Sequence, residues 1–141
     1  MGKVKVFLDS DVIISSLLSK TGASFEILKN ARVKKVISTT IKEEVRVAAK
    51  RLNIDLSKKN LFQDLKTISL KLKKARLAEE YLLYVLDQED SHVVAGAYIA
   101  KANFLLTHNL KHYQVAKIKN DFGIIVMKPG NFLQYLRSLK N

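Results

Sequence analysis

Cysteine and tryptophan are absent from this chain of 141 residues, and proline occurs once. The lack of cysteine excludes a disulfide scaffold, a thiolate zinc site, an iron–sulfur cluster and a cysteine nucleophile. It also agrees with a reducing, cytoplasmic environment. The longest apolar run, Val93 to Ala100, falls far short of the roughly 20 residues that a membrane-spanning helix needs. No secretory signal is expected at the N-terminus either, so we expect no membrane partner.

Acidic residues are scarce: 13 Asp and Glu stand against 25 Lys and Arg, which gives a net charge of +12. Residues 29–76 carry 15 basic and four acidic side chains, whereas residues 77–90 carry five acidic and no basic ones. A basic excess of this size suits a polyanionic partner such as RNA. Lysine-rich composition is also common in thermophilic proteins, so charge alone leaves both interpretations open.

The length and the 48% hydrophobic content predict a single domain over residues 1–141. Short apolar runs that end in polar residues predict strands, and apolar residues at three- and four-residue spacing predict helices between them. Alternating strands and helices indicate a three-layer α/β/α sandwich with a mostly parallel central sheet of about four to five strands. The predicted strands are 4–8, 36–38, 104–107 and 124–127; the predicted helices include 40–52, 57–66, 70–86, 91–101 and 131–139, with 56–86 wholly helical.

Several acidic residues fall where these elements begin or end. Asp9 and Asp11 follow the first strand, at the sheet edge where ligands collect, although a carboxylate there also caps helices. In helix 40–52 the apolar stripe is Ile41, Val45, Ala48 and Leu52. Glu44 lies on or beside that stripe, so it needs a cation or an ion pair with Lys or Arg.

Two further polar residues follow the same pattern. Asp90 precedes the most apolar helix and shares its inward face, with helix capping as the alternative role. Asn109 follows the strand that ends at Leu106, where its amide either caps the next helix or supplies an oxygen ligand. His108 and His112 have helical zinc spacing but no recognisable third ligand.

Together, Asp9, Glu44 and Asp90 are expected to converge on one edge of the sheet, where they would repel one another without a counter-charge. Oxygen ligands without cysteine or a histidine cluster select Mg²⁺ or Mn²⁺. The sequence therefore predicts a divalent-cation site.

Four motifs follow one another along the chain: Val6 to Val12 with Leu17, Leu18 and Gly22; Ile37-Ser38 with Glu44-Val45; Asp87 to Ala97; and Ala102 to Asn109. In this order they resemble the motifs of PIN-domain proteins, a family of metal-dependent ribonucleases that includes the VapC-type toxins of toxin–antitoxin pairs. The departures are in the fourth motif, where Thr107-His108-Asn109 stands for the usual Thr-Gly-Asp, and at Asp11, where the family usually has Asn.

The resemblance implies a PIN-like endoribonuclease that uses Mg²⁺ or Mn²⁺ to cleave RNA, with an antitoxin protein and a second copy of the chain as further partners. It assigns catalysis to Asp9, Glu44 and Asp90. Asp9 and Asp90 would hold the metal, Glu44 would orient or deprotonate a water, and Asp11 and Asn109 would complete the shell. The residues expected to contact the phosphates of the substrate are Ser10, Thr107, Lys42 and Arg46.

Two alternatives remain open at this point. The replacement at Asn109 favours a PIN-like module that binds RNA or regulates a partner with weakened catalysis. The acids after the first strand, together with Thr107 and Lys128-Pro129, also suit a phospho-acceptor receiver domain. That domain requires a phosphorylatable Asp at the end of a middle strand, whereas Asp55 lies in a segment predicted to be helical.

Overall fold

A computed structural model describes residues 3–58 and 60–139, apart from the side chains of Lys58 and Lys74. The described elements, with η for short 3-10 helices, are β1 (Val4–Leu8), α1 (Ser10–Leu18), α2 (Ala23–Lys29), β2 (Val33–Ser38), α3 (Thr39–Arg51), η1 (Leu56–Lys58), β3 (Lys66–Ile68), α4 (Lys74–Tyr81), η2 (Leu82–Tyr84), η3 (Gln88–Asp90), α5 (Ser91–Ile99), β4 (Phe104–Leu106), η4 (Leu110–His112), α6 (Val115–Phe122), β5 (Ile125–Met127) and α7 (Pro129–Ser138).

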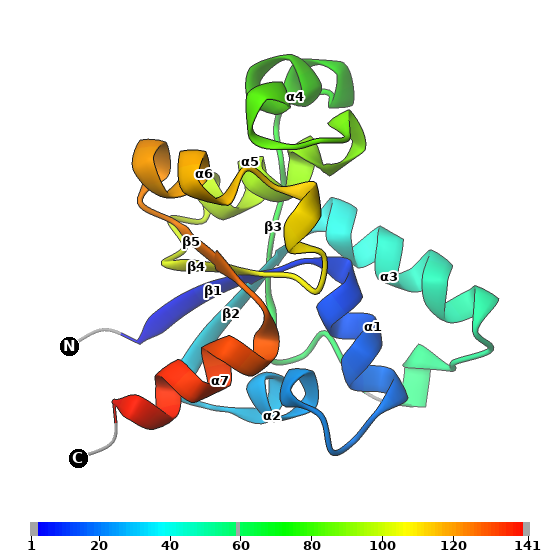
Figure 1. The fold of residues 1–141 in the computed structure, drawn as a ribbon. Coiled ribbons are helices and arrows are strands. Elements are labelled where there is room, and N and C mark those ends of the chain that lie inside the picture. Colours follow the sequence, from blue (N-terminus) through cyan, green and yellow to red (C-terminus); the bar gives the residue numbers. More distant parts are fainter. Residues whose placement is uncertain (1–2, 59, 140–141) are drawn as a thin grey trace.

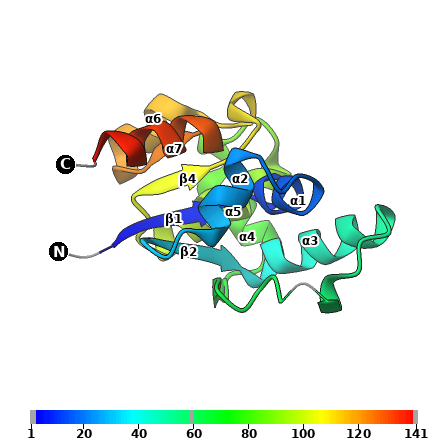
Figure 2. The same ribbon diagram turned by 90° about the horizontal axis from the view of Figure 1, so that it is seen from below.

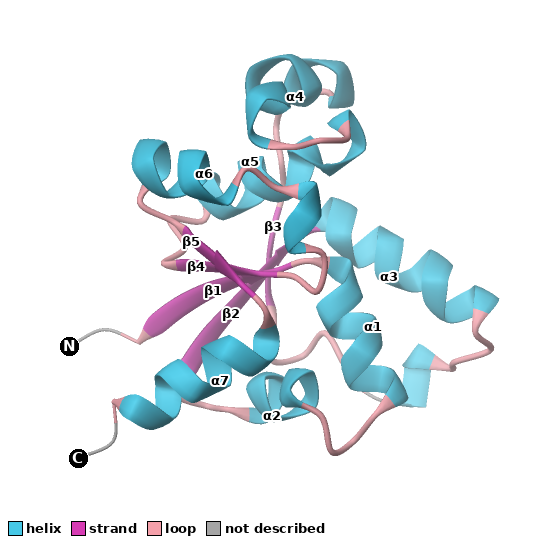
Figure 3. Cartoon of the chain, viewed as in Figure 1, coloured by secondary structure: helices cyan, strands magenta, loops and turns pink. Residues whose placement is uncertain are grey.

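The strands form one parallel sheet in the order β3-β2-β1-β4-β5 (Figures 1 and 3). The chain builds outward from β1 to β3 and then returns to place β4 on the other side of β1. The strand order therefore reverses between β1 and β4, and in open α/β sheets the crevice beyond the carboxyl ends at such a point is the usual ligand site.

Helices cover both faces of the sheet. Figure 1 shows α4, α5 and α6 on one side and α1, α2 and α7 on the other, and Figure 2 shows α1 and α2 from below. This confirms the predicted three-layer sandwich. Among the described residues, no helix is both long and apolar enough to span a membrane.

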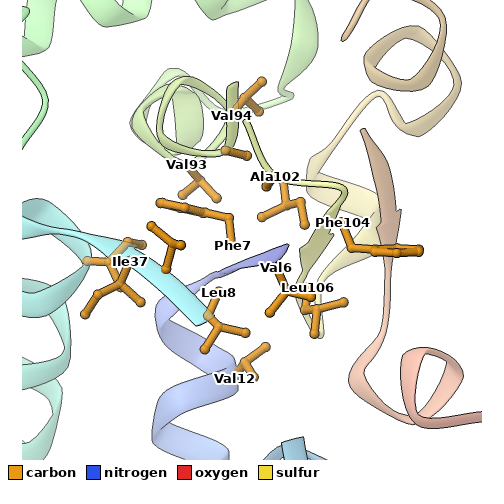
Figure 4. Packing of buried hydrophobic residues seen from close by; sticks show 14 of the residues in the cluster. Val6, Phe7, Leu8, Val12, Ile37, Val93, Val94, Ala102, Phe104 and Leu106 are labelled. Atoms are coloured by element: carbon orange, nitrogen blue, oxygen red, sulfur yellow. The ribbon is translucent and has the colours of Figure 1, made fainter. Parts of the chain in front are cut away.

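The core is densest where α5 crosses β1. Phe7 is fully buried beneath Val93 of α5, while Leu8 points to the opposite side of the sheet toward Val12 of α1 (Figure 4). A Cβ atom at Gly96 would overlap the Phe7 ring, so only glycine permits this approach of helix and strand. Close packing of α5 on β1 holds the start of α5, at Asp90, near the carboxyl end of β1.

The prediction that residues 56–86 are wholly helical is wrong in part. It contains the edge strand β3, and its regular α-helix spans only Lys74–Tyr81. Pairing with β2 outweighs the helix-like spacing of the leucines there, because strand formation depends on the neighbouring strand. The predicted stripe of the helix 40–52 also shifts: Ala49 is buried, whereas Leu52 is 47% exposed. The single domain over residues 1–141 stays a prediction.

Candidate metal centre

Asp9 and Thr107 meet at the reversal point of the strand order. Asp9 directly follows β1 and Thr107 directly follows β4, and the Asp9 amide donates to the Leu106 carbonyl at 3.0 Å. Because β1 and β4 are parallel neighbours, the residues after them lie at the same edge of the sheet. Both residues are buried, Thr107 completely.

The Asp9 carboxylate is held by hydrogen bonds from several elements. Its Oδ1 accepts from the Ser10 amide at 2.8 Å, and its Oδ2 accepts from the Thr107 hydroxyl at 3.0 Å and the Tyr113 hydroxyl at 2.7 Å. Donors from α1, from the end of β4 and from the segment after η4 thus fix its orientation. Asp9 occupies the N-cap position of α1, but most of its partners come from elsewhere in the fold.

Asp11 joins the same network. Its Oδ2 accepts from the His108 amide at 3.1 Å and from the Asn109 side-chain amide at 3.0 Å, and it lies 3.3 Å from the Thr107 hydroxyl. Burial and the nearby charge of Asp9 raise the pKa of Asp11 to about 6. Of the two roles considered for Asn109, helix capping is not observed. Its side chain makes no cap hydrogen bond at η4 and donates to Asp11 instead.

Asp90 is the third carboxylate at this edge. It occupies the N-cap position of α5 without a capping side-chain hydrogen bond, whereas Asp87 caps the preceding turn by accepting from the Glu89 amide at 3.0 Å. Burial, and next the charge of Asp9, raise the pKa of Asp90. Its Oδ2 lies 3.4 Å from His112 Nδ1. Asp90 is thus electrostatically coupled to Asp9 rather than used as a helix cap.

Glu44 has a different environment from that predicted. Its side chain is 43% exposed, and its Oε2 lies 3.0 Å from Nε2 of the buried His92 in α5. The partner is therefore a histidine and not the lysine or arginine considered from the sequence. A hollow of about 190 Å³ opens beside this pair, with Thr40, Leu70, Leu72, Leu77 and Glu89 as its other lining residues. Among the described residues no hydrogen bond joins Glu44 to Asp90. The two are connected through α5, which carries His92 and begins directly after Asp90.

Tyr113 is the main residue that the sequence did not indicate. Its pKa is raised by burial, and then by the charges of Asp9, Asp90 and Asp11 together with its hydrogen bond to Asp9. The Tyr113 hydroxyl thus contacts Asp9 directly, and the charges of Asp90 and Asp11 also act on it. Tyr113 reaches this position because it pairs with Val85 in an antiparallel bridge, a long-range contact without a local sequence signal.

The histidines also have roles that their spacing did not predict. His108 Nε2 lies 3.3 Å from the Ser24 hydroxyl, while His112 faces Asp90. The two side chains have separate partners, so their four-residue spacing forms no zinc pair. His92 carries no sequence signal, since only the tertiary fold brings this residue of α5 to Glu44 of α3.

The residues expected to bind substrate fall into two groups. Ser10 and Thr107 belong to the network around Asp9, where the Ser10 backbone amide and the Thr107 hydroxyl hold carboxylates. Lys42 Nζ and the Arg46 guanidinium lie over the Phe62 ring, 5.0 and 5.8 Å from its centroid, on α3. A helix turns by about 100° per residue, so both residues project from a different side of α3 than Glu44. Their role in substrate binding stays a prediction.

The fit of a divalent cation can be judged from these groups. Within residues 3–58 and 60–139, no three His, Asp or Glu side chains are already grouped to hold one metal ion. Three carboxylates nevertheless share this edge, and in the same described part of the chain none of them forms an ion pair with Lys or Arg. Oxygen donors with negative charge that no lysine or arginine neutralises are what Mg²⁺ and Mn²⁺ require, so the residues fit such an ion in charge and donor type.

The protein thus has a parallel α/β sheet with an acidic site beyond the carboxyl ends of β1 and β4, where the strand order reverses. The chain belongs to the PIN-domain family, since the family model of the PIN domain matches residues 5–111. The match includes Asp9, Glu44, Asp90 and Asn109 and stops just before His112 and Tyr113. Membership of this family overturns the receiver interpretation. Asp55, moreover, is exposed and holds the Ser57 hydroxyl at 2.6 Å beside η1, away from any strand end.

Solved structures share the fold. A toxin–antitoxin complex from Klebsiella pneumoniae superposes with a TM-score of 0.64 at 19% identity, covering 88% of this chain and 97% of the other. VapBC2 from Rickettsia felis, bound to a DNA fragment from its promoter, gives a TM-score of 0.63 at 14% identity, covering 89% and 98%. Among curated proteins no significant match is found.

Proposed function

We propose that this protein is a Mg²⁺- or Mn²⁺-dependent endoribonuclease with its centre at Asp9, Asp11 and Asp90. One observation carries the proposal: at the reversal point of the strand order Asp9 and Asp11 share the Thr107 hydroxyl and Asp90 is electrostatically coupled to Asp9, with no lysine or arginine paired to them in the described chain. Membership of the PIN-domain family supports a nuclease, and the net charge of +12 supports an RNA substrate.

Asp9 and Asp90 would hold the metal, while Asp11 and Asn109 would complete its surroundings. When bound, Mg²⁺ or Mn²⁺ supplies charge stabilisation for phosphodiester cleavage and lowers the pKa of a water molecule. Tyr113 and Thr107 orient the Asp9 carboxylate, as outer partners of metal ligands commonly do. Glu44 keeps an exposed carboxylate and is the group proposed to accept the proton of the attacking water, with His92 fixing its position.

The test is cleavage of RNA by the purified chain with Mg²⁺, with Mn²⁺ and with EDTA. We expect Asp90→Asn to lower the rate more than about 100-fold, because loss of an outer partner alone costs 10- to 100-fold. Asp87→Asn is the matched control, since it makes the same chemical change three residues away at an exposed turn. Equal cleavage by Asp90→Asn and the wild type would refute the assignment.

We also propose that the protein acts as the toxin of a toxin–antitoxin pair, in the cytoplasm and as a homodimer. The two structural neighbours are named as such complexes, which supports an antitoxin partner. Expression of the wild type should arrest growth, while Asp90→Asn should not. Co-expression with the product of the adjacent reading frame should restore growth. Continued arrest there would exclude that product as the antitoxin, and a monomer in sedimentation would exclude the dimer.

Asn109 favours a second candidate, a PIN-like module with weakened catalysis that binds RNA or regulates a partner. Its side chain donates to Asp11 at 3.0 Å, where the usual Asp would add a fourth negative charge. This candidate predicts RNA binding without turnover, and Asn109→Asp would then switch cleavage on. A wild type that already cleaves RNA at the rate of Asn109→Asp would exclude it.

A further inference from the structure

Lysines gather at the amino end of the sheet, opposite the carboxylates. Lys5 of β1 and Lys34 of β2 are direct neighbours in the parallel register. Lys66 of β3 is paired with Val36, two residues after Lys34, so side-chain alternation puts all three lysines on the same face. Burial, followed by the charges of Lys34, Lys66 and Lys101, lowers the pKa of Lys5. The side chains are therefore close enough to repel one another.

A groove of about 460 Å³ opens at this end of β2 and β3. We call it the lysine groove; its charged lining consists of Lys3, Lys29, Lys34, Lys35, Lys66 and a single acid, Asp64. Lys35 is 5% exposed, and its Nζ donates to the carbonyls of Leu28 at 2.7 Å and Asn30 at 2.9 Å. Two carbonyls hold this ammonium in place; burial lowers its pKa, and the charge of Asp64 acts in the opposite direction.

The lysines of this groove also lack ion pairs in the described part of the chain, whereas Lys117 and Arg137 elsewhere have partners in Asp121 and Glu26. Like charges set side by side on neighbouring strands disfavour the folded chain on its own. An anionic ligand would convert this repulsion into binding. The lining contains no aromatic residue on which a base could stack, so the groove suits a phosphate backbone rather than the bases.

We propose that the lysine groove binds the phosphate backbone of single-stranded RNA, at the end of the sheet opposite the metal centre. The choice of RNA rests on the proposed function. The five residues of β1 span about 16 Å between the two ends, so a strand that reaches both must extend over several nucleotides. Contacts of this kind favour no base sequence, and their affinity falls with salt.

The experiment compares two double variants of the full chain. Lys34→Gln with Lys66→Gln removes two charges from the groove; Lys50→Gln with Lys119→Gln removes two from exposed positions on α3 and α6. Binding of a labelled single-stranded RNA oligonucleotide of mixed sequence is measured by anisotropy in EDTA over a range of KCl concentrations. EDTA prevents metal-dependent cleavage, so binding is separated from the metal centre.

We expect the groove variant to bind at least about five-fold more weakly than the control variant. Its slope of log K against log salt should fall by about 1.4, since each contact to a single strand contributes about 0.7. Equal losses in both variants would overturn the proposal, because only total charge would then matter. Preferential binding of duplex DNA of equal length would overturn the assignment to single-stranded RNA.

The groove proposal and the nuclease assignment can fail separately. If Asp90→Asn abolishes cleavage while the groove variant binds RNA like the control variant, the groove proposal fails alone. If the groove variant loses RNA binding but the wild type shows no metal-dependent cleavage, the nuclease assignment fails and the groove proposal stands.

Discussion

The two ends of the central sheet carry opposite charges and are built differently. At the carboxyl end, Asp9 and Asp11 share the Thr107 hydroxyl, and Asp90, from a distant part of the sequence, is electrostatically coupled to Asp9. At the amino end, strand register sets Lys5, Lys34 and Lys66 on the same face of the sheet.

Each end of the sheet brings together charges of one sign, and their repulsion disfavours the folded chain. At the acidic end the hydrogen bonds orient the side chains, which a metal centre requires. The lysines of the basic end stay long and exposed apart from Lys5 and Lys35, which is sufficient for contacts to a phosphate backbone. Geometry should therefore matter most at the acidic end, and the amount of charge at the basic end.

The largest effect that tests this difference is expected at Tyr113. Tyr113→Phe removes the 2.7 Å hydrogen bond to Asp9 without changing the charge of the site. We expect cleavage to fall by about 10- to 100-fold and the affinity for Mn²⁺ to weaken, because the carboxylate loses an orienting partner. Titration with Mn²⁺ and a rate assay at saturating metal separate the two effects.

Tyr84→Phe is the matched control for that variant. It removes an exposed hydrogen bond of the same length, 2.7 Å, to Asp121, a carboxylate that does not belong to the acidic end. Cleavage by this variant should match that of the wild type. If Tyr113→Phe also cleaves RNA normally and binds Mn²⁺ unchanged, orientation of Asp9 is not what the acidic end provides.

A smaller effect is expected in the pH dependence of stability. Asp11 has a pKa of about 6 in the folded chain against 3.8 as the ordinary value. A raised carboxyl pKa stabilises the fold below the ordinary value, and that contribution is lost as pH rises through about 6. In EDTA, the free energy of unfolding should fall by about 1–2 kcal/mol between pH 4 and 7, a value reduced for partial solvent screening.

Asp11→Asn should abolish most of this loss in denaturant unfolding curves, and Mg²⁺ should offset it in the wild type. Asp55→Asn serves as the control of opposite sign, because hydrogen bonds from Ser57 lower the pKa of this exposed carboxyl. It should leave the loss of stability between pH 4 and 7 in place. A wild type whose stability does not change over that range in EDTA would show that the pKa of Asp11 is not raised in the folded chain.

Local sequence patterns predicted the parts of the fold that depend on short-range signals. β1 and β4 are apolar runs ended by polar residues, which is why the meeting of Asp9, Asp11 and Asn109 at one edge could be expected. The strand β3 was missed because Lys66, Thr67 and Ile68 become a strand only by pairing with β2. Its surroundings carry leucines at a spacing that is typical of a helix.

The contacts that depend on tertiary packing could not be predicted. Tyr113 reaches Asp9 through its bridge to Val85, and His92 reaches Glu44 across two helices. The exposure of Glu44 was misjudged for a related reason. The buried stripe of α3 runs through Ala49 rather than through Ala48 and Leu52, so Glu44 lies at the edge of the stripe and half in solvent.

The smallest expected effect concerns the basic end without any ligand. If Lys34 serves RNA binding and not folding, Lys34→Gln should relieve its repulsion with Lys5 and raise the free energy of unfolding by about 0.2–1 kcal/mol. The gain should shrink at high salt, because salt screens exposed charges. Urea unfolding curves at low and high KCl measure it, with Lys119→Gln as the control that should show no gain. A loss of stability in Lys34→Gln would show that this lysine supports the fold, and the contrast between the two ends would then fail at its basic end.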